Sequence, residues 1–201
     1  MLKNARLRVE KGVIRTFNAR RGRISKGQDF ALTNYFPEYE LIDGPWDFQE
    51  LFDSKEVYFE IGCGAGESTI GFAENSPEKI IIAAEVHRPG ISHLVKNAYE
   101  KDLKNIRVLY TDGVQVLRDW VPDSSLTAIL AFFPDPWQKK RHHKRRLFRA
   151  EIIELMIKKL KPNGEIIIAT DWGQYAEEIL ELLPNSGKTV RPSWRPETKY
   201  E

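Results

Sequence analysis

Three acidic residues stand where short apolar runs end, and a glycine-rich turn follows the first of them. Glu60 lies near the end of the run EVYFEI, directly before Gly62-Cys63-Gly64-Ala65-Gly66. Glu85 ends a second run, about 20 residues past the glycines, and Asp112 ends a third. Glycine lets the backbone turn tightly and approach a ligand closely. This pattern predicts a small-molecule site built on successive strand ends.

The acid before the turn favours one ligand class over another. The spacing G-x-G-x-G differs from the G-x-G-x-x-G of dinucleotide sites. Glu60 would repel a pyrophosphate, but it suits the cationic amino-acid end of S-adenosylmethionine. A carboxylate at the place of Glu85 accepts hydrogen bonds from ribose hydroxyls, and Asp112 can meet the adenine amino group. We therefore predict S-adenosylmethionine rather than NAD as the cofactor, bound by Glu60, Gly62, Gly64, Glu85 and Asp112. The alternative is a glycine turn that only separates a strand from a helix.

The segment Phe133-Pro134-Asp135-Pro136-Trp137 follows a fourth apolar run. Proline fixes its own backbone φ, so two prolines around an acid hold the carboxylate in one direction. At a strand end, that direction places it beside the methyl group of the cofactor. We predict that Asp135 lies at the reaction site, next to the cofactor. The alternative is a proline turn with an incidental acid.

Positive charge is concentrated in two segments. The net charge of the chain is +2, yet residues 1–35 and residues 139–149 (KKRHHKRRLFR) each carry +7, which leaves −12 on the remainder. Two basic islands on an acidic body predict a face that binds a polyanion. The alternative is a pair of solvated basic segments.

Elements of alternating type must position these residues. Apolar runs rich in β-branched residues are typical of strands buried on both faces of a parallel sheet. Strands are predicted at 56–61, 79–86, 106–112, 126–133 and 165–171, and helices at 67–75, 89–102, 114–120, 144–160 and 172–183. Pro162-Asn163-Gly164 supplies a turn before the last strand. The alternation predicts an α/β fold with a doubly wound, mostly parallel sheet at 51–201, and a basic N-terminal extension at 1–50 that packs on the edge of the sheet.

Composition excludes several classes of protein. The longest apolar run is shorter than the roughly 18–20 residues that span a bilayer. The N-terminus lacks the apolar region of a signal peptide. One cysteine, Cys63, excludes an internal disulfide or a cysteine-based zinc cluster. We expect a cytoplasmic protein that binds no membrane and no metal, as a monomer or a homodimer.

The motifs together resemble the bacterial tRNA (guanine-N7)-methyltransferase family, over the chain from about residue 13. The segment Phe133–Trp137, followed by Lys139 and the run 141–146, resembles its most distinctive signature. Further similar segments are 15–17, 20–28, 60–64, 85–86, 169–172 and 195–201. The resemblance implies a class I (Rossmann-like) methyltransferase fold and methyl transfer to N7 of a guanosine in the variable loop of tRNA.

The resemblance also implies roles for individual residues. Glu60, Glu85 and Asp112 would bind S-adenosylmethionine. Asp135 would be the catalytic or guanine-holding acid and would also contact the cofactor. Residues implied to contact the target nucleotide or the RNA backbone are Lys139, Arg141, Lys144, Arg145, Arg146, Asp171, Thr198, Lys199 and Glu201. Members of the family continue past the TKYE stretch into a further strand, so we expect either that the chain is truncated after Glu201 or that the sheet lacks its final strand.

Two other functions are compatible with parts of the pattern. An exocyclic-amine methyltransferase is the nearer one, because P-D-P-W loosely resembles the D-P-P-Y loop of those enzymes. The cationic run after the loop favours a tRNA substrate instead. A non-catalytic RNA-binding module on the same scaffold would not need Glu60, Glu85 and Asp112 together.

Overall fold

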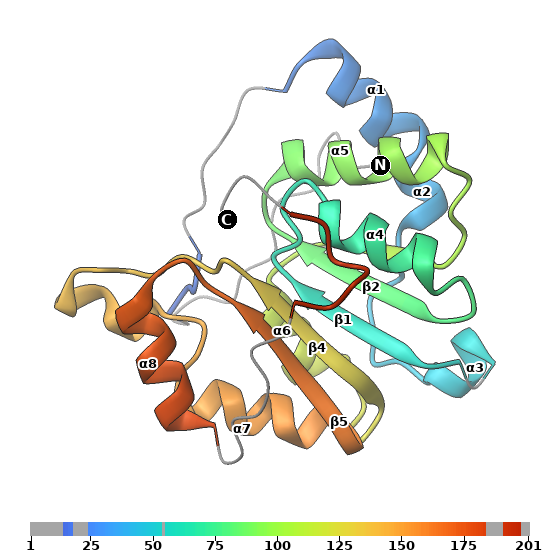
Figure 1. The fold of residues 1–201 in the computed structure, drawn as a ribbon. Helices are drawn as coiled ribbons and strands as arrows, with labels where there is room; N and C mark the ends of the chain where they lie inside the picture. The colour runs from blue at the N-terminus through green and yellow to red at the C-terminus, as the bar shows by residue number, and fades with distance from the viewer. Residues whose placement is uncertain (1–13, 18–23, 54, 184–190, 198–201) are drawn as a thin grey trace.

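The protein is a parallel α/β sheet covered by helices on both faces (Figure 1). The structure, a computed structural model, describes residues 14–17, 24–53, 55–183 and 191–197. Within these ranges the sheet has five strands, all parallel, in the order β3-β2-β1-β4-β5. They are β1 (Val57–Ile61), β2 (Ile80–Glu85), β3 (Ile106–Tyr110), β4 (Leu126–Phe132) and β5 (Leu160–Ala169). The predicted doubly wound α/β fold is confirmed.

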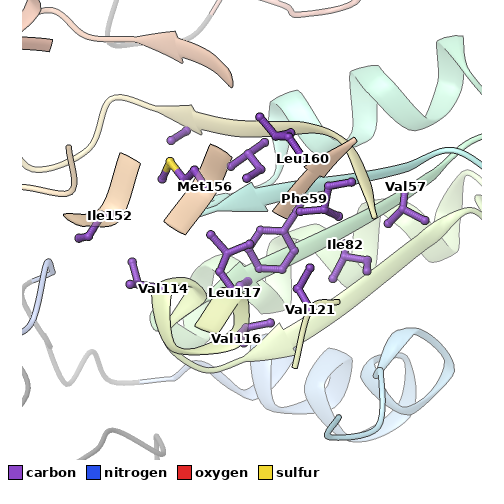
Figure 2. Close-up of a cluster of buried hydrophobic side chains, with 14 of the residues drawn as sticks. Val57, Phe59, Ile82, Val114, Val116, Leu117, Val121, Ile152, Met156 and Leu160 are labelled. Carbon is purple, nitrogen blue, oxygen red and sulfur yellow. The ribbon is translucent and has the colours of Figure 1, made fainter. Parts of the chain in front are cut away.

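Alternate residues of the strands enter two separate cores. In β2, Ile80 and Ile82 belong to one buried cluster, and Ile81 and Ala83 belong to the other. This division explains the unbroken apolar runs, because a strand covered on both faces has no side that tolerates polar residues. Figure 2 shows the first cluster, where the ring of Phe59 lies among side chains of the strands and of the helices that cover that face.

Two groups of helices cover the two faces. The first cluster is completed by α3 (Phe48–Phe52), α6 (Gly113–Asp119), α7 (Ala150–Lys159) and α8 (Gly173–Leu182). The second is completed by α1 (Lys26–Asn34), α2 (Phe36–Tyr39), α4 (Glu67–Asn75) and α5 (Arg88–Glu100). None of the helices in the described part of the chain combines the length and apolarity needed to cross a bilayer.

The predicted helix at 144–160 is wrong in its first part. A 3₁₀ helix, η2 (Lys140–Arg145), comes first, and α7 begins only at Ala150. Between them Arg146, Leu147 and Phe148 are all buried. Three consecutive buried residues do not fit a surface helix, which buries one stripe of its circumference. The burial of this short connection therefore delays the start of α7.

An irregularity in β5 lies where the sequence predicts a turn. Leu126 and Ala128 of β4 are two residues apart, but their partners in β5 are Leu160 and Glu165. The three extra residues are taken up around Asn163, which has a φ of 66°. Asparagine tolerates this left-handed conformation better than most residues. The regular pairing begins again at Glu165, where the sequence predicts the strand to start.

The described part of the N-terminal extension covers the β3 edge and helix α5. A capping box of Ser25 and Gln28 starts α1. Leu32 of α1 and Phe36 of α2 are buried in the cluster that contains α5. Glu40 then forms a parallel bridge with Val108 of β3. The buried side chains of residues 24–41 are thus part of the core.

Candidate active site

The candidate site lies at the carboxyl ends of β1 and β4. From β1 the chain adds β2 and then β3 on one side of the sheet. It then returns to add β4 and β5 on the other side of β1, so the order of the strands reverses between β1 and β4. Ligands of open α/β sheets bind in the crevice at such a reversal, at the carboxyl ends of the strands.

The glycine turn after β1 opens onto free space. Gly62 has a φ of 74° and Gly64 a φ of 58°, a conformation that side chains disfavour. A Cβ atom added at either position would meet no atom within 4 Å. At Gly90 of α5, by contrast, an added Cβ would lie 2.2 Å from the carbonyl oxygen of Gly64. The turn is therefore closely packed on its α5 side and leaves room for a ligand on the other.

Glu85, the last residue of β2, holds this turn in place. Its Oε2 accepts a hydrogen bond from the Gly64 N–H at 2.7 Å, and its Oε1 accepts from the N–H groups of Val86 at 2.6 Å and His87 at 2.8 Å. Burial raises the pKa of this carboxyl, and the three backbone donors oppose the rise. A carboxylate offers about four acceptor positions, so Glu85 retains capacity for about one further donor in this conformation.

Glu60 is buried at the end of β1, with 2% of its surface exposed. Its Oε2 accepts a hydrogen bond from Thr69 Oγ1 of α4 at 2.5 Å. Burial raises the pKa of Glu60 to about 7, against the lowering effect of that hydrogen bond. A cationic group beside Glu60 would restore its charged form, so this position favours an ammonium ligand.

Asp112 caps the helix that follows β3. Its Oδ1 accepts a hydrogen bond from the Val114 N–H at 2.9 Å, which fixes the carboxylate at the start of α6. Burial raises the pKa of this carboxyl, and the hydrogen bonds from the backbone of Val114 and Gln115 oppose the rise.

These positions fit S-adenosylmethionine. Two glycines leave open space beside the turn. A buried acid that favours a cation is the last residue but one of β1, and further buried acids end β2 and follow β3. Glu60 would hold the amino group of the methionine part, Glu85 the ribose and Asp112 the adenine. The fold brings the predicted cofactor residues of the first three strand ends to one edge of the sheet, and the loop of the sixth, Asp135, follows β4 at the same edge.

The segment after β4 is fixed at several points around Asp135. Phe133 and Trp137 have φ values of 49° and 45°. The Phe133 N–H donates to the carbonyl of Ala169 at the end of β5, at 2.8 Å. The Pro136 carbonyl accepts from Arg146 Nε at 2.9 Å. Asp135 itself is exposed. The loop is therefore held firmly and presents its carboxylate outward.

Arg146 is not in a position to bind RNA, which corrects its prediction as a phosphate contact. Only 2% of its side chain is exposed. The guanidinium forms an ion pair with Glu178 of α8 and lies 4.8 Å from the centre of the Tyr175 ring. Together with the bond to Pro136, these contacts tie the Asp135 loop to α8. Arg146 is therefore a structural residue, because its guanidinium is buried and engaged by Glu178, Tyr175 and Pro136.

The neighbouring cations of η2 face the solvent. Lys139, Arg141, Lys144 and Arg145 are all exposed. In the described part of the chain, none of the four lies within ion-pair distance of a carboxylate. The short helix thus displays a group of uncompensated positive charges directly after the Asp135 loop.

Trp137 joins this basic helix to the N-terminal extension. Its indole N–H donates to the carbonyl of Thr16 at 3.1 Å, across 121 residues of sequence. The guanidinium of Arg145 lies 5.0 Å from the centre of its ring, and His142 contacts it edge to face at 5.7 Å. The two basic islands of the sequence therefore meet at one aromatic residue.

Of the remaining predicted substrate residues, one lies in the described part of the chain and three lie outside it. Asp171 is exposed two residues beyond β5, and the bond between Phe133 and Ala169 places its loop beside the Asp135 loop. Thr198, Lys199 and Glu201 lie outside the described residues.

Three residues make contacts at the site although the sequence motifs assigned them no role there. They are Thr69, Trp137 and Arg195. Thr69 follows the glycine turn in the first turn of α4, and that position is the only signal in the sequence that could have pointed to it.

Known proteins show what this chain is similar to. Residues 54–200 match a family model described as "Putative methyltransferase". A relative named tRNA (guanine-N(7)-)-methyltransferase, from Stutzerimonas stutzeri (strain A1501), is 44% identical over 201 residues, which cover 94% of this chain and 84% of the relative. One of the same name, from Legionella pneumophila (strain Lens), is 40% identical over 203 residues, which cover 94% and 90%.

A solved structure agrees on the fold. The 16S rRNA methyltransferase KamB superposes with a TM-score of 0.50 at 14% identity, covering 74% of this chain and 68% of KamB. The matching family model spans most of the chain, and the similarity to the curated relatives covers 94% of it. This chain belongs to the tRNA (guanine-N(7)-)-methyltransferase family.

Proposed function

We propose that this protein transfers a methyl group from S-adenosylmethionine to N7 of a guanosine in tRNA. The observation that carries the proposal is the placement of the Asp135 loop, which follows β4 at the proposed cofactor crevice and runs directly into the exposed cations of η2. The shared name of the relatives supports the same activity. The resemblance of the motifs points to a guanosine of the variable loop, and a tRNA substrate supports an activity in the cytoplasm.

The division of the chain follows from this proposal. We assign residues 51–201 to the methyltransferase domain and residues 1–50 to the basic extension. The packing of α1 and α2 against α5 supports an extension that is held on the domain. Its Thr16 carbonyl accepts from Trp137, so part of the extension lies beside the Asp135 loop.

The proposed mechanism relies on positioning and charge. When bound, S-adenosylmethionine supplies an electrophilic methyl group on a sulfonium. Guanine N7 has an in-plane lone pair and no proton at neutral pH, so the reaction needs no general base. The chain must align the base with the cofactor, and Asp135 stabilises the positive charge that develops on guanine. Asp135 and Asp171 can also accept hydrogen bonds from the guanine ring N–H and amino group, which selects guanine over adenine.

The direct test uses unmodified tRNA as the substrate. Incubation with the protein and S-adenosylmethionine should produce 7-methylguanosine, detected by mass spectrometry of the digested nucleosides, and should produce none with heat-denatured protein. A methylated nucleoside with the methyl group on the exocyclic amine would contradict the proposed site of transfer. Binding of tRNA without any methylation would favour a non-catalytic RNA-binding protein.

The cations of η2 should bind phosphate. Replacement of Arg141, Lys144 and Arg145 by Gln should weaken tRNA binding and lower the slope of log affinity against log salt by roughly one unit for each lost contact. The measurement is a tRNA titration by fluorescence anisotropy at several salt concentrations.

A matched triple variant provides the control for this effect. Lys55, Lys158 and Lys161 are exposed near the amino ends of β1, β4 and β5, at the opposite edge of the sheet. Their replacement by Gln changes the net charge equally and should leave the slope nearly unchanged. Equal losses in the two triple variants would mean that η2 contributes only overall charge.

A further inference from the structure

The segment 191–197 crosses helix α4 close to the end of β1 (Figure 1). A Cβ atom added at Gly71 of α4 would lie 2.5 Å from the carbonyl oxygen of Trp194 and 3.0 Å from Pro196. The Trp194 ring contacts the Phe72 ring edge to face, with centres 5.2 Å apart. The close fit fixes the path of this segment across the molecule.

This path places Arg195 against the carboxyl end of β4, the strand next to β1. The Arg195 guanidinium lies 5.1 Å from the ring centre of Phe132, at the end of β4, and 5.6 Å from that of Phe133. Its side chain is 5% exposed. Glu60 lies on the neighbouring strand β1, where it pairs with Leu130 of β4, two residues before Phe132. Arg195 therefore lies against the end of the strand beside Glu60, and its positive charge opposes the rise in the pKa of that carboxyl.

The methionine part of S-adenosylmethionine carries two opposite charges close together. Its ammonium suits Glu60, so its carboxylate needs donors or a cation near by. The N–H groups of Gly62, Gly64 and Gly66 already donate to Ala84, Glu85 and Cys63. The first turn of α4 carries Glu67, whose charge would repel a carboxylate. A guanidinium is well matched to a carboxylate, because its fork of N–H groups can bind both oxygens.

We propose that Arg195 binds the carboxylate of the methionine part of S-adenosylmethionine, opposite Glu60. The two side chains then recognise the zwitterionic end of the cofactor as a pair. This proposal rests on the proposed function only because it takes S-adenosylmethionine as the ligand. It assigns a cofactor contact to the segment 191–197, which follows α8.

A ligand that lacks the carboxylate tests this assignment. Calorimetry would compare S-adenosylmethionine with decarboxylated S-adenosylmethionine, which keeps the ammonium, the sulfonium and the adenosine. The wild-type protein should bind the complete cofactor at least tenfold more tightly. Arg195→Met keeps an unbranched apolar stem against the rings of Phe132 and Phe133 and removes the charge. It should lose at least tenfold in affinity for S-adenosylmethionine and change by less than about threefold for the decarboxylated form.

The outcomes separate the possible roles of Arg195. Arg195→Lys, which keeps the charge, should recover part of the preference for the carboxylate and supplies a second readout if Arg195→Met folds poorly. An equal loss of affinity for both ligands would mean that Arg195 only supports Glu60 or the segment, and would overturn the proposal. Unchanged binding of both ligands would also overturn it and place the carboxylate at the start of α4. Failure of the wild-type protein to bind either ligand would overturn the proposed function itself.

Discussion

A tRNA that carries 7-deazaguanosine at the target position is expected to bind with near-normal affinity and to accept no methyl group. Replacement of N7 by carbon removes the lone pair that attacks the methyl group. The Watson–Crick edge, which we propose is read by Asp135 and Asp171, is unchanged. The expected result is a complete loss of transfer, measured with radiolabelled S-adenosylmethionine, alongside a binding curve close to that of the natural tRNA.

This substitution in the substrate separates the proposed reaction from methylation of an exocyclic amine. An enzyme of that second kind still finds its amino group in 7-deazaguanosine and must also remove a proton from the attacking nitrogen. A tRNA with guanosine at the target position and 7-deazaguanosine elsewhere is the control and should be methylated normally. Transfer to the modified target at a rate near the natural one would rule out N7 as the nucleophile.

Loss of the Asp135 carboxylate should affect the rate far more than it affects cofactor binding. The loop is anchored by the Phe133 N–H and by Arg146, so its path does not depend on the exposed Asp135 side chain. Removal of one preorganised group that stabilises developing charge typically costs about a hundredfold or more in kcat. Asp135→Ala is therefore expected to lower kcat by at least about a hundredfold, with the affinity for S-adenosylmethionine changed only a few-fold.

A second variant distinguishes the two roles proposed for Asp135. Asp135→Asn keeps the size and one acceptor oxygen but removes the charge. If the charge matters most, kcat should fall nearly as far as in Asp135→Ala; if Asp135 mainly holds guanine, the larger change should be in KM for tRNA. Asp119→Ala, an exposed acid at the end of α6, is the control. An Asp135→Ala protein that retains more than half of the wild-type turnover would mean that another acid has this role.

The sequence by itself determined the sheet and the edge at which the proposed site is built. Strands buried on both faces read as unbroken apolar runs, so β2 and β4 were visible without any structure. The chain order then placed Glu60, Glu85 and Asp112 at the carboxyl ends of parallel strands, which lie along one edge by geometry. The motif around Asp135, followed by its cations, was specific enough to indicate the family.

Only the tertiary structure decided which members of the basic run face solvent. Arg145 and Arg146 are adjacent and chemically identical, yet one is exposed over Trp137 and the other is buried against Glu178 and Tyr175. The difference depends on α8, more than 25 residues further along the chain. No local pattern encodes it, and the same burial explains why α7 begins later than its sequence predicts.

The long-range contacts of the site were equally hidden in the sequence. Trp137 meets Thr16 across 121 residues, and Arg195 reaches the carboxyl end of β4 because its segment packs against Gly71 and Phe72 of α4. The hydrophobic pattern along the chain reflects which residues are buried, and the polarity of each residue type is enough to read it. The strands and their order in the sequence can therefore be predicted. The partner of a single side chain depends instead on how distant segments pack, and that information exists only once the chain has folded.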